Sequence, residues 1–166
     1  MRITLITFAI LLLALISACG NRKKKKQNPE QAVEQTNKYT TEKGSTVWVM
    51  LAELTAEMPS DAFTLIDVHV DDMNKLHITA EYSGGCKPHE FKILGSKAIL
   101  KSLPAQRPIV ITHNANGDEC RSIIREEILV DISDFAYTKE NGSEIILLIG
   151  DQRLSYIYQA LGVNDK

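Results

Sequence analysis

The sequence predicts an all-β domain, an Ig-like β-sandwich of about seven or eight strands with a short helix before it. Three observations lead to this fold class. From Phe63 onward, short apolar runs alternate with clusters of turn-forming residues. Within Leu76–Tyr82, apolar and polar side chains alternate with the period of a half-buried strand. The one helix that the apolar spacing predicts lies before Phe63. A small barrel built from the same strands is the alternative architecture.

The first predicted element is a helix of about three turns. Ser45 or Thr46 is its candidate N-cap, and Pro59 ends it. A strand that opens at Val47–Val49 is the alternative interpretation of the same segment. The apolar residues that recur at the spacing of one helical face are Val47, Met50, Leu51, Leu54 and Met58.

The strands that follow are bounded by turn signals. Asp71–Asn74 separates the first two, and Gly84–Gly85 ends the second. Asn141–Gly142 and Gly150–Asp151 are turn pairs near the C-terminus, and they predict that the last strands form a hairpin. The predicted strands are Phe63–Val70, Leu76–Tyr82, Phe91–Leu94, Ile99–Leu100, Ile109–Ile111, Cys120–Ile132, Ile145–Ile149 and Leu154–Tyr158.

Length, composition and charge limit the class of protein. The 166 residues, of which 44% are apolar, suit one globular domain and exclude a fully disordered chain. The net charge of −2 argues against a dedicated nucleic-acid-binding protein. Residues 19–46 carry seven Lys or Arg and three Asp or Glu, a charge of +4, whereas residues 47–166 carry 11 and 18, a charge of −7. Arg2 supplies the remaining +1, so the chain divides into a basic tether and an acidic domain.

Residues 1–18 have the pattern of a secretory signal peptide. Arg2 precedes a nearly continuous apolar run, Ile3–Ile16, which is shorter than the roughly 20 residues that a membrane-spanning helix needs. An uncleaved N-terminal anchor is the alternative. The segment Ile16–Cys19, with the sequence Ile-Ser-Ala-Cys, resembles the lipobox of bacterial lipoproteins. The resemblance implies cleavage before Cys19, lipidation of its sulfur and acylation of its new amino group, for example with palmitate, and therefore a lasting membrane anchor.

Residues 19–46 are predicted to form a flexible tether, because they hold too few apolar side chains to build a core. Lys23, Lys24, Lys25 and Lys26 begin four residues beyond the predicted lipid. There they can meet anionic headgroups at about 1 kcal/mol per lysine, and plain solvation of a spacer is the alternative. Gly20 stands where Asp retains enteric-type lipoproteins at the inner membrane. By that resemblance we expect the outer membrane of a Gram-negative cell envelope.

With Cys19 assigned to the lipid, Cys86 and Cys120 remain as a pair. A secreted protein reaches an oxidising compartment, so we expect these two cysteines to form a disulfide. In the chain-entropy model, closing a loop of roughly 35 residues stabilises the fold by roughly 3.5–4 kcal/mol. A metal site and a redox-active pair are the alternatives.

The surroundings of both cysteines form a marked pattern. Gly84–His89 reads Gly-Gly-Cys-x-x-His, and His113–Cys120 reads His-x-x-x-x-Asp-x-Cys. An apolar stretch then closes with Asp131–Ser133. The pattern resembles small bacterial secreted lipoproteins of uncharacterised function, and the resemblance covers roughly Leu76–Ser133. It implies a fold and a cell-envelope location, and it implies no activity.

His89, His113 and Asp118 form the candidate functional cluster. The plainer interpretation is that both imidazoles hydrogen-bond loop backbone beside the disulfide. A zinc ion held by Cys86, His89, His113 and Cys120 is the alternative, because two thiolates and two imidazoles are a plausible zinc set. Against zinc, the spacing is not that of a standard zinc finger, and an oxidising compartment favours the disulfide.

The sequence contains none of the common catalytic motifs G-x-S-x-G, H-E-x-x-H, Walker A or G-x-G-x-x-G. We therefore predict no catalytic residue and no cofactor. The predicted function is a non-enzymatic binding or structural module displayed from a membrane, with a protein or glycan partner that the sequence leaves open. The alternative is a metal-binding or redox periplasmic protein that uses Cys86, His89, His113 and Cys120.

Overall fold

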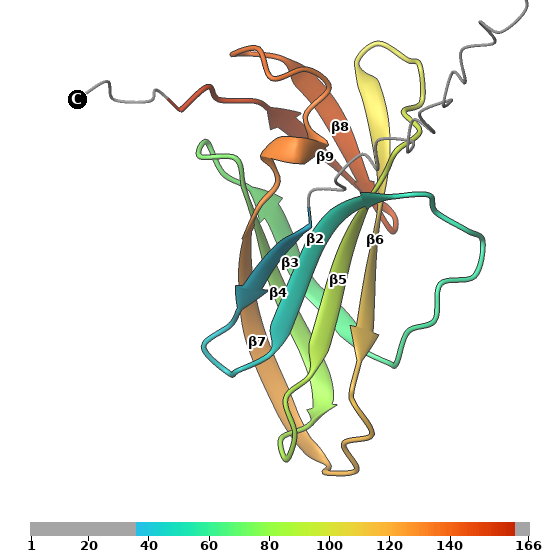
Figure 1. Cartoon of the computed structure of the whole chain (residues 1–166), viewed down its shortest axis with the longest axis vertical. Helices are drawn as coiled ribbons and strands as arrows, with labels where there is room; N and C mark the ends of the chain where they lie inside the picture. The colour runs from blue at the N-terminus through green and yellow to red at the C-terminus, as the bar shows by residue number, and fades with distance from the viewer. Residues whose placement is uncertain (1–35, 162–166) are drawn as a thin grey trace, which may run out of the picture. The chain divides into compact units, whose positions relative to one another are not determined.

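The computed structural model describes residues 36–161, which consist of strands and their connections (Figure 1). The all-β prediction is confirmed for this part of the chain, which holds no α-helix. One short 3-10 turn, η2 (Ser133–Phe135), follows the seventh strand. The strands are β1 (Asn37–Thr40), β2 (Thr46–Ala52), β3 (Thr64–Val70), β4 (Lys75–Gly84), β5 (Glu90–Ser96), β6 (Ala105–Asn114), β7 (Ser122–Asp131), β8 (Glu144–Ile149) and β9 (Gln152–Ile157).

The strands form two sheets. The larger sheet has the order β1-β2-β5-β6-β8-β9, and the smaller has the order β3-β4-β7. Two neighbouring pairs, β2 with β5 and β6 with β8, are parallel. The predicted C-terminal hairpin is confirmed, because β8 and β9 pair antiparallel. Buried side chains of both sheets share one apolar core, for example Val47 and Phe91 of the larger sheet with Leu76 and Ile128 of the smaller.

The predicted helix is wrong, because residues 46–52 form strand β2. Val47 and Val49 are buried, whereas Thr46, Trp48 and Met50 are half-buried, which is the alternation of a strand. Apolar residues on both faces of the strand produced the helical spacing by coincidence. The deciding contact is the parallel pairing with β5, whose residues lie about forty positions away in the chain.

The domain begins before the predicted boundary at Val47. Strand β1 lies inside the range predicted as tether and pairs with β2 from Thr46 to Val49. Its Tyr39 packs against the core. A short edge strand of this kind needs backbone hydrogen bonds and little apolar surface, so composition alone did not separate it from a spacer. The predicted strand Ile99–Leu100 is reduced to one bridge between Leu100 and Gln106.

The signal peptide, the lipobox with Cys19 and the lysine run all lie outside the described residues. Those predictions therefore stay predictions. Among the described residues, no helix is long and apolar enough to cross a membrane.

The domain has two distinct ends. At one end, which we call the tip, the β4–β5 connection (residues 85–89) meets the β6–β7 connection (residues 115–121). The β5–β6 loop (residues 97–104) lies at the opposite end (Figure 1). Strand β1 runs toward the tip, because Asn37 pairs with Val49 in the middle of β2 and Thr40 pairs with Thr46 at its start, and β2 runs parallel to β5. The chain therefore leads into β1 from the direction away from the tip.

Gly95 on β5 lets η2 pack closely on the larger sheet. A Cβ at this position would lie 2.8 Å from Cε1 of Phe135, whose side chain is fully buried. Arg107 is also buried and donates hydrogen bonds to the carbonyl oxygens of Phe135 (2.9 Å), Ala136 (3.3 Å) and Ser96. Burial lowers the pKa of the Arg107 guanidinium. These contacts hold η2 in place over the sheet.

Gly95→Ala is expected to lower the free energy of unfolding by about 1–3 kcal/mol, because the new methyl group overpacks a rigid core. Urea denaturation measures the change. Lys92→Ala is the matched control at an exposed position of the same strand, and its effect should stay within about 0.5 kcal/mol. Equal midpoints for the two variants would contradict the close packing of Phe135 on Gly95.

Candidate functional site

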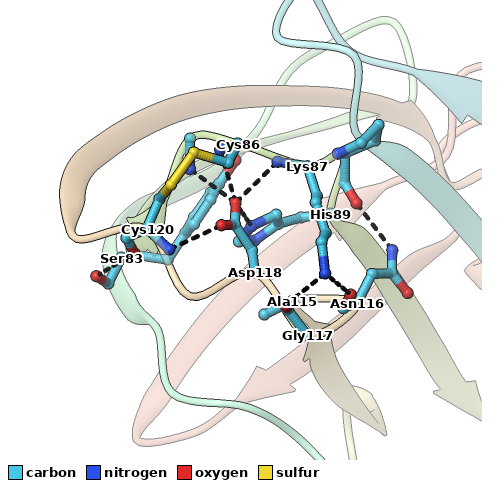
Figure 2. A network of polar contacts seen from close by, with 12 residues as sticks. Ser83, Cys86, Lys87, His89, Ala115, Asn116, Gly117, Asp118 and Cys120 are labelled. Atoms are coloured by element: carbon cyan, nitrogen blue, oxygen red, sulfur yellow. Dashed lines mark hydrogen bonds and ion pairs between the residues drawn. A yellow bond between two sulfur atoms is a disulfide. The ribbon is translucent and has the colours of Figure 1, made fainter.

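The tip is closed by a covalent bond between its two connections (Figure 2). Cys86 and Cys120 form the predicted disulfide, with their Cα atoms 5.9 Å apart. Each connection passes from one sheet to the other, since β4 and β7 belong to the smaller sheet and β5 and β6 to the larger. The bond therefore ties together two crossings between the sheets.

Asp118 gathers the backbone of both connections onto one carboxylate. Its Oδ2 accepts hydrogen bonds from the backbone N–H groups of Gly85 (2.9 Å), Cys86 (2.8 Å) and Lys87 (2.9 Å). Its Oδ1 accepts one from Cys120 (2.9 Å). Three successive N–H groups converge because Gly85 has a φ of +114°, a backbone conformation that favours glycine. These donors, with Cys120 the largest contributor, hold the pKa of Asp118 well below its usual range.

The two predicted histidines lie in contact behind Asp118. His89 Nε2 is 3.3 Å from Asp118 Oδ2, and His89 Nδ1 is 2.7 Å from His113 Nε2. An ionised carboxylate only accepts hydrogen bonds, so we assign the His89 proton to Nε2. A neutral His89 then accepts at Nδ1 from the Nε2–H of His113. The structure thus brings the three residues of the candidate cluster together in one chain of hydrogen bonds.

The histidine pair is enclosed by aromatic rings and by a close backbone approach. The Tyr82 ring lies 4.5 Å from His89 and 4.9 Å from His113, and Phe91 stacks on His113 at 4.7 Å, all between centroids. A Cβ on Gly84 would lie 2.6 Å from His89 Nε2. Two separate requirements therefore explain the Gly-Gly pair: Gly84 leaves room for the His89 imidazole, and Gly85 adopts the backbone conformation of the turn.

The outer part of the tip is tied by a second set of hydrogen bonds. Lys87 Nζ donates to the carbonyl oxygen of Gly117 (2.6 Å) and to that of Asn116 (3.4 Å). Asn116 Nδ2 donates to the carbonyl oxygen of Pro88 (2.8 Å). Each contact joins one connection to the other, so the two connections act as one rigid unit.

A buried carboxylate, Glu126, was missed by the sequence reasoning. It is 1% exposed and accepts hydrogen bonds from the hydroxyls of Tyr82 (2.6 Å), Ser45 (2.9 Å) and Thr41. Burial and then this hydrogen bond raise the pKa of Tyr82 to about 12. The signal was present in the sequence, because Glu126 shares the alternation of the apolar residues that follow it on β7 and so points inward.

The histidine pair is almost fully buried, and His113 lies at the edge of a hollow of about 390 Å³ that Ser60 and Asp61 also line. His89 is 2% and His113 is 3% exposed. Among the described residues, no atom lies in hydrogen-bond geometry with His113 Nδ1. The backbone of Ala62 and Asp61 is close enough to raise the pKa of His113, yet burial and then the neighbouring His89 lower it overall. The cluster is therefore built like an internal support for the tip.

The four residues of the alternative zinc set do not converge as ligands in this structure. Both sulfurs are joined in the disulfide, so neither is a thiolate ligand in this form. The ligand atoms that lie within 4.8 Å of one another, in the part of the chain that the structure describes, belong to Cys86, Asp118 and Cys120. His89 and His113 are directed toward each other and toward Asp118 instead.

Comparisons with known proteins found no matching family model and no matching curated protein. A solved structure of a NigD-like immunity protein from Bacteroides caccae ATCC 43185 is similar to this chain, with 14% sequence identity and a TM-score of 0.46. The match covers 74% of this chain and 69% of that chain.

The stability of the domain is expected to fall on acidification below about pH 6.5, the ordinary pKa of histidine. The pKa of His113 is lower in the folded state than in the unfolded chain. The unfolded chain therefore takes up the proton at a higher pH, and its free energy falls relative to that of the folded state as the pH decreases. His113→Asn should flatten the decline of the urea midpoint between pH 7 and pH 5. An identical slope in wild type and variant would contradict this assignment. Asp118, whose folded pKa is lowered, adds its own loss only below about pH 4.

Asp118→Asn is expected to make the disulfide easier to reduce. The dithiothreitol concentration at which half of the disulfide is reduced should fall several-fold. The carboxylate holds the backbone of both cysteines in position, and its negative charge disfavours the two thiolates that reduction produces. Quantification of free thiols after equilibration with dithiothreitol measures the effect. Glu119→Gln removes a carboxylate from the neighbouring, exposed position and should leave the reduction curve unchanged. A curve that shifts equally in both variants would contradict the role of Asp118.

Proposed function

We propose that this protein is a lipid-anchored protein of the cell envelope whose β-domain is a non-catalytic binding module. In this proposal Cys19 carries the lipid, the outer membrane of a Gram-negative cell is the location, and the two sheets form an Ig-like sandwich. The signal pattern and the lipobox of residues 1–19 support the anchor. The two sheets with one shared core support the sandwich.

The observation that carries the binding role is the construction of the tip. Two connections between sheets are joined by a disulfide and meet on one carboxylate, Asp118. Loops are commonly the mobile parts of a fold and also the parts that bind. A loop surface that is rigid beforehand loses little conformational entropy when a partner binds, which raises affinity. We therefore place the binding surface at the tip.

The chemistry of the tip suits a polar partner, such as a protein or glycan surface. Its exposed side chains include polar and charged groups of both signs, with Lys87, Asn116, Glu119 and Arg121 among them. The histidine cluster lies beneath this surface and positions it. In this proposal, His89, His113 and Asp118 support the binding surface and contact no partner.

A redox function is the second candidate, and the exposed position of Cys86 in the disulfide is the observation that favours it. Titration of free thiols and elemental analysis of the denatured, unreduced protein separate the candidates. One disulfide without bound metal excludes a zinc protein. A disulfide that resists reduction by glutathione at physiological ratios excludes the redox role.

Cys19→Ala is expected to move the protein from the membrane fraction to the soluble fraction. Incorporation of labelled palmitate should be lost in the same variant, because both acylation sites are on this residue. Ser17→Gly is the matched control within the lipobox segment and should keep the label, since glycine is also a small residue. A Cys19→Ala variant that still floats with membranes and keeps residues 1–18 would contradict the anchor.

A photo-crosslinking residue placed at Glu119 of the tip is expected to yield a discrete adduct in cells. The same residue at Leu129, an exposed position on the outer face of the smaller sheet, is the matched control and should yield none. Denaturing gels of the two variants compare the adducts. Adducts of equal yield from both positions, or none from the tip, would contradict a binding surface at the tip.

A further inference from the structure

The end of the domain opposite the tip carries an exposed apolar loop. Leu103, in the β5–β6 loop, is 101% exposed, and Leu100 in the same loop is 49% exposed. Tyr137, which follows η2, is 56% exposed and lines the same hollow as Leu103. That hollow has a volume of about 800 Å³. Large apolar side chains that gather in this way indicate a contact surface rather than isolated exposure.

We infer that this loop is a membrane-contact surface that rests in the headgroup region of the lipid bilayer to which Cys19 is anchored. The inference rests on the proposed lipid anchor and goes beyond it, because it assigns an orientation to the domain. The occupant is a phospholipid bilayer. The loop and Tyr137 face the lipid, and the disulfide-closed tip points away from it.

The path of the chain favours the bilayer as the occupant. Strand β1 runs away from the end that carries the β5–β6 loop, because Asn37 pairs with Val49 in the middle of β2, and Lys97 at the start of the loop donates its backbone N–H to the carbonyl oxygen of Ala52 at the end of β2. Eighteen residues lead from Cys19 to Asn37. Even fully extended, they span about 65 Å. The segment that joins the proposed anchor to the domain therefore leads into β1 from the direction of the end that carries the loop.

The chemistry of the loop also matches an interfacial position. Leucine side chains at a loop apex can enter the boundary between headgroups and acyl chains, and tyrosine is enriched at that depth. Lys101 is exposed between Leu100 and Leu103 and can pair with phosphate groups. By contrast, the exposed side chains of the tip that are named above are polar or charged. The loop thus combines leucine and lysine side chains, with a tyrosine beside them, of the kinds that occur at a bilayer interface.

Exposed apolar side chains occur toward both ends of the smaller sheet, and Ile123, which is 69% exposed, lies near the tip. Met73, which is 54% exposed, lies in the β3–β4 turn. That turn is at the end away from the tip, because β4 runs from it to the disulfide-closed connection. In the smaller sheet, too, an apolar side chain is thus exposed at the end that the proposal places toward the lipid.

The experiment uses the mature, lipidated full-length protein in vesicles of phosphatidylcholine and phosphatidylglycerol. In a Trp48→Phe background, one tryptophan is placed at Leu103, at Glu119 of the tip or at Leu129 of the smaller sheet. Lipids brominated near the headgroup quench tryptophan at short range. We expect quenching of the Leu103→Trp protein to exceed that of the Glu119→Trp and Leu129→Trp proteins several-fold.

Equal quenching at the three positions would overturn the inference. So would an unquenched but blue-shifted emission at position 103 in a protein that sediments as a dimer, because a second copy would then cover the loop. Leu100→Trp repeats the measurement in case one variant folds poorly, which far-UV circular dichroism reveals. Flotation of the same vesicles tests the anchor separately, because a protein that fails to float contradicts the proposed lipidation rather than the orientation.

Discussion

The tip of this domain depends on one carboxylate, that of Asp118. Three successive N–H groups of the β4–β5 connection and the N–H of Cys120 all point at its two oxygens. Each of these donors would otherwise need water or another acceptor, because backbone N–H groups are rarely left unpaired. The disulfide then joins two backbones that the carboxylate has already brought together. Asp118 also sets the tautomer of His89, and through it the hydrogen bond to His113.

A second buried carboxylate, that of Glu126, also stabilises the region around the histidines. Glu126 accepts hydrogen bonds from three hydroxyls, two of which, Thr41 and Ser45, belong to the β1–β2 connection. The third hydroxyl belongs to Tyr82, whose ring covers both histidines. The two networks therefore meet at Tyr82, one through its hydroxyl and the other through its ring. Buried polar groups that are satisfied in this way favour a single arrangement of the strands around them.

Sequence reasoning located the tip far better than it located the strands around it. The residue types near Cys86 and Cys120 indicated the disulfide, and the structure adds that His89, His113 and Asp118 are in contact. The helix predicted over the β2 segment is wrong because the parallel partner of β2, strand β5, is distant in sequence, and no local pattern encodes such a pairing. The sequence predicts strand β1 as part of the tether because an edge strand with polar side chains has the composition of a spacer. The role of Glu126 as a buried acceptor was missed because two of its donors, the hydroxyls of Thr41 and Ser45, lie more than eighty residues earlier in the chain.

An aspartate and two histidines in one hydrogen-bonded row look like catalytic machinery, and their surroundings argue for a different role. A general base needs a nitrogen that a substrate can reach, within hydrogen-bond distance of the proton to be removed. Both imidazoles here are almost fully buried, and the nitrogens of His89 are both engaged within the protein. Tyr82 and Phe91, which are part of the core, pack on the imidazoles, and His113 lines a hollow of about 390 Å³ with Ser60 and Asp61. The same rigidity is an advantage for a binding surface, because the row fixes the loops that a partner would meet. The burial of this row is therefore the property on which the proposed recognition at the tip depends.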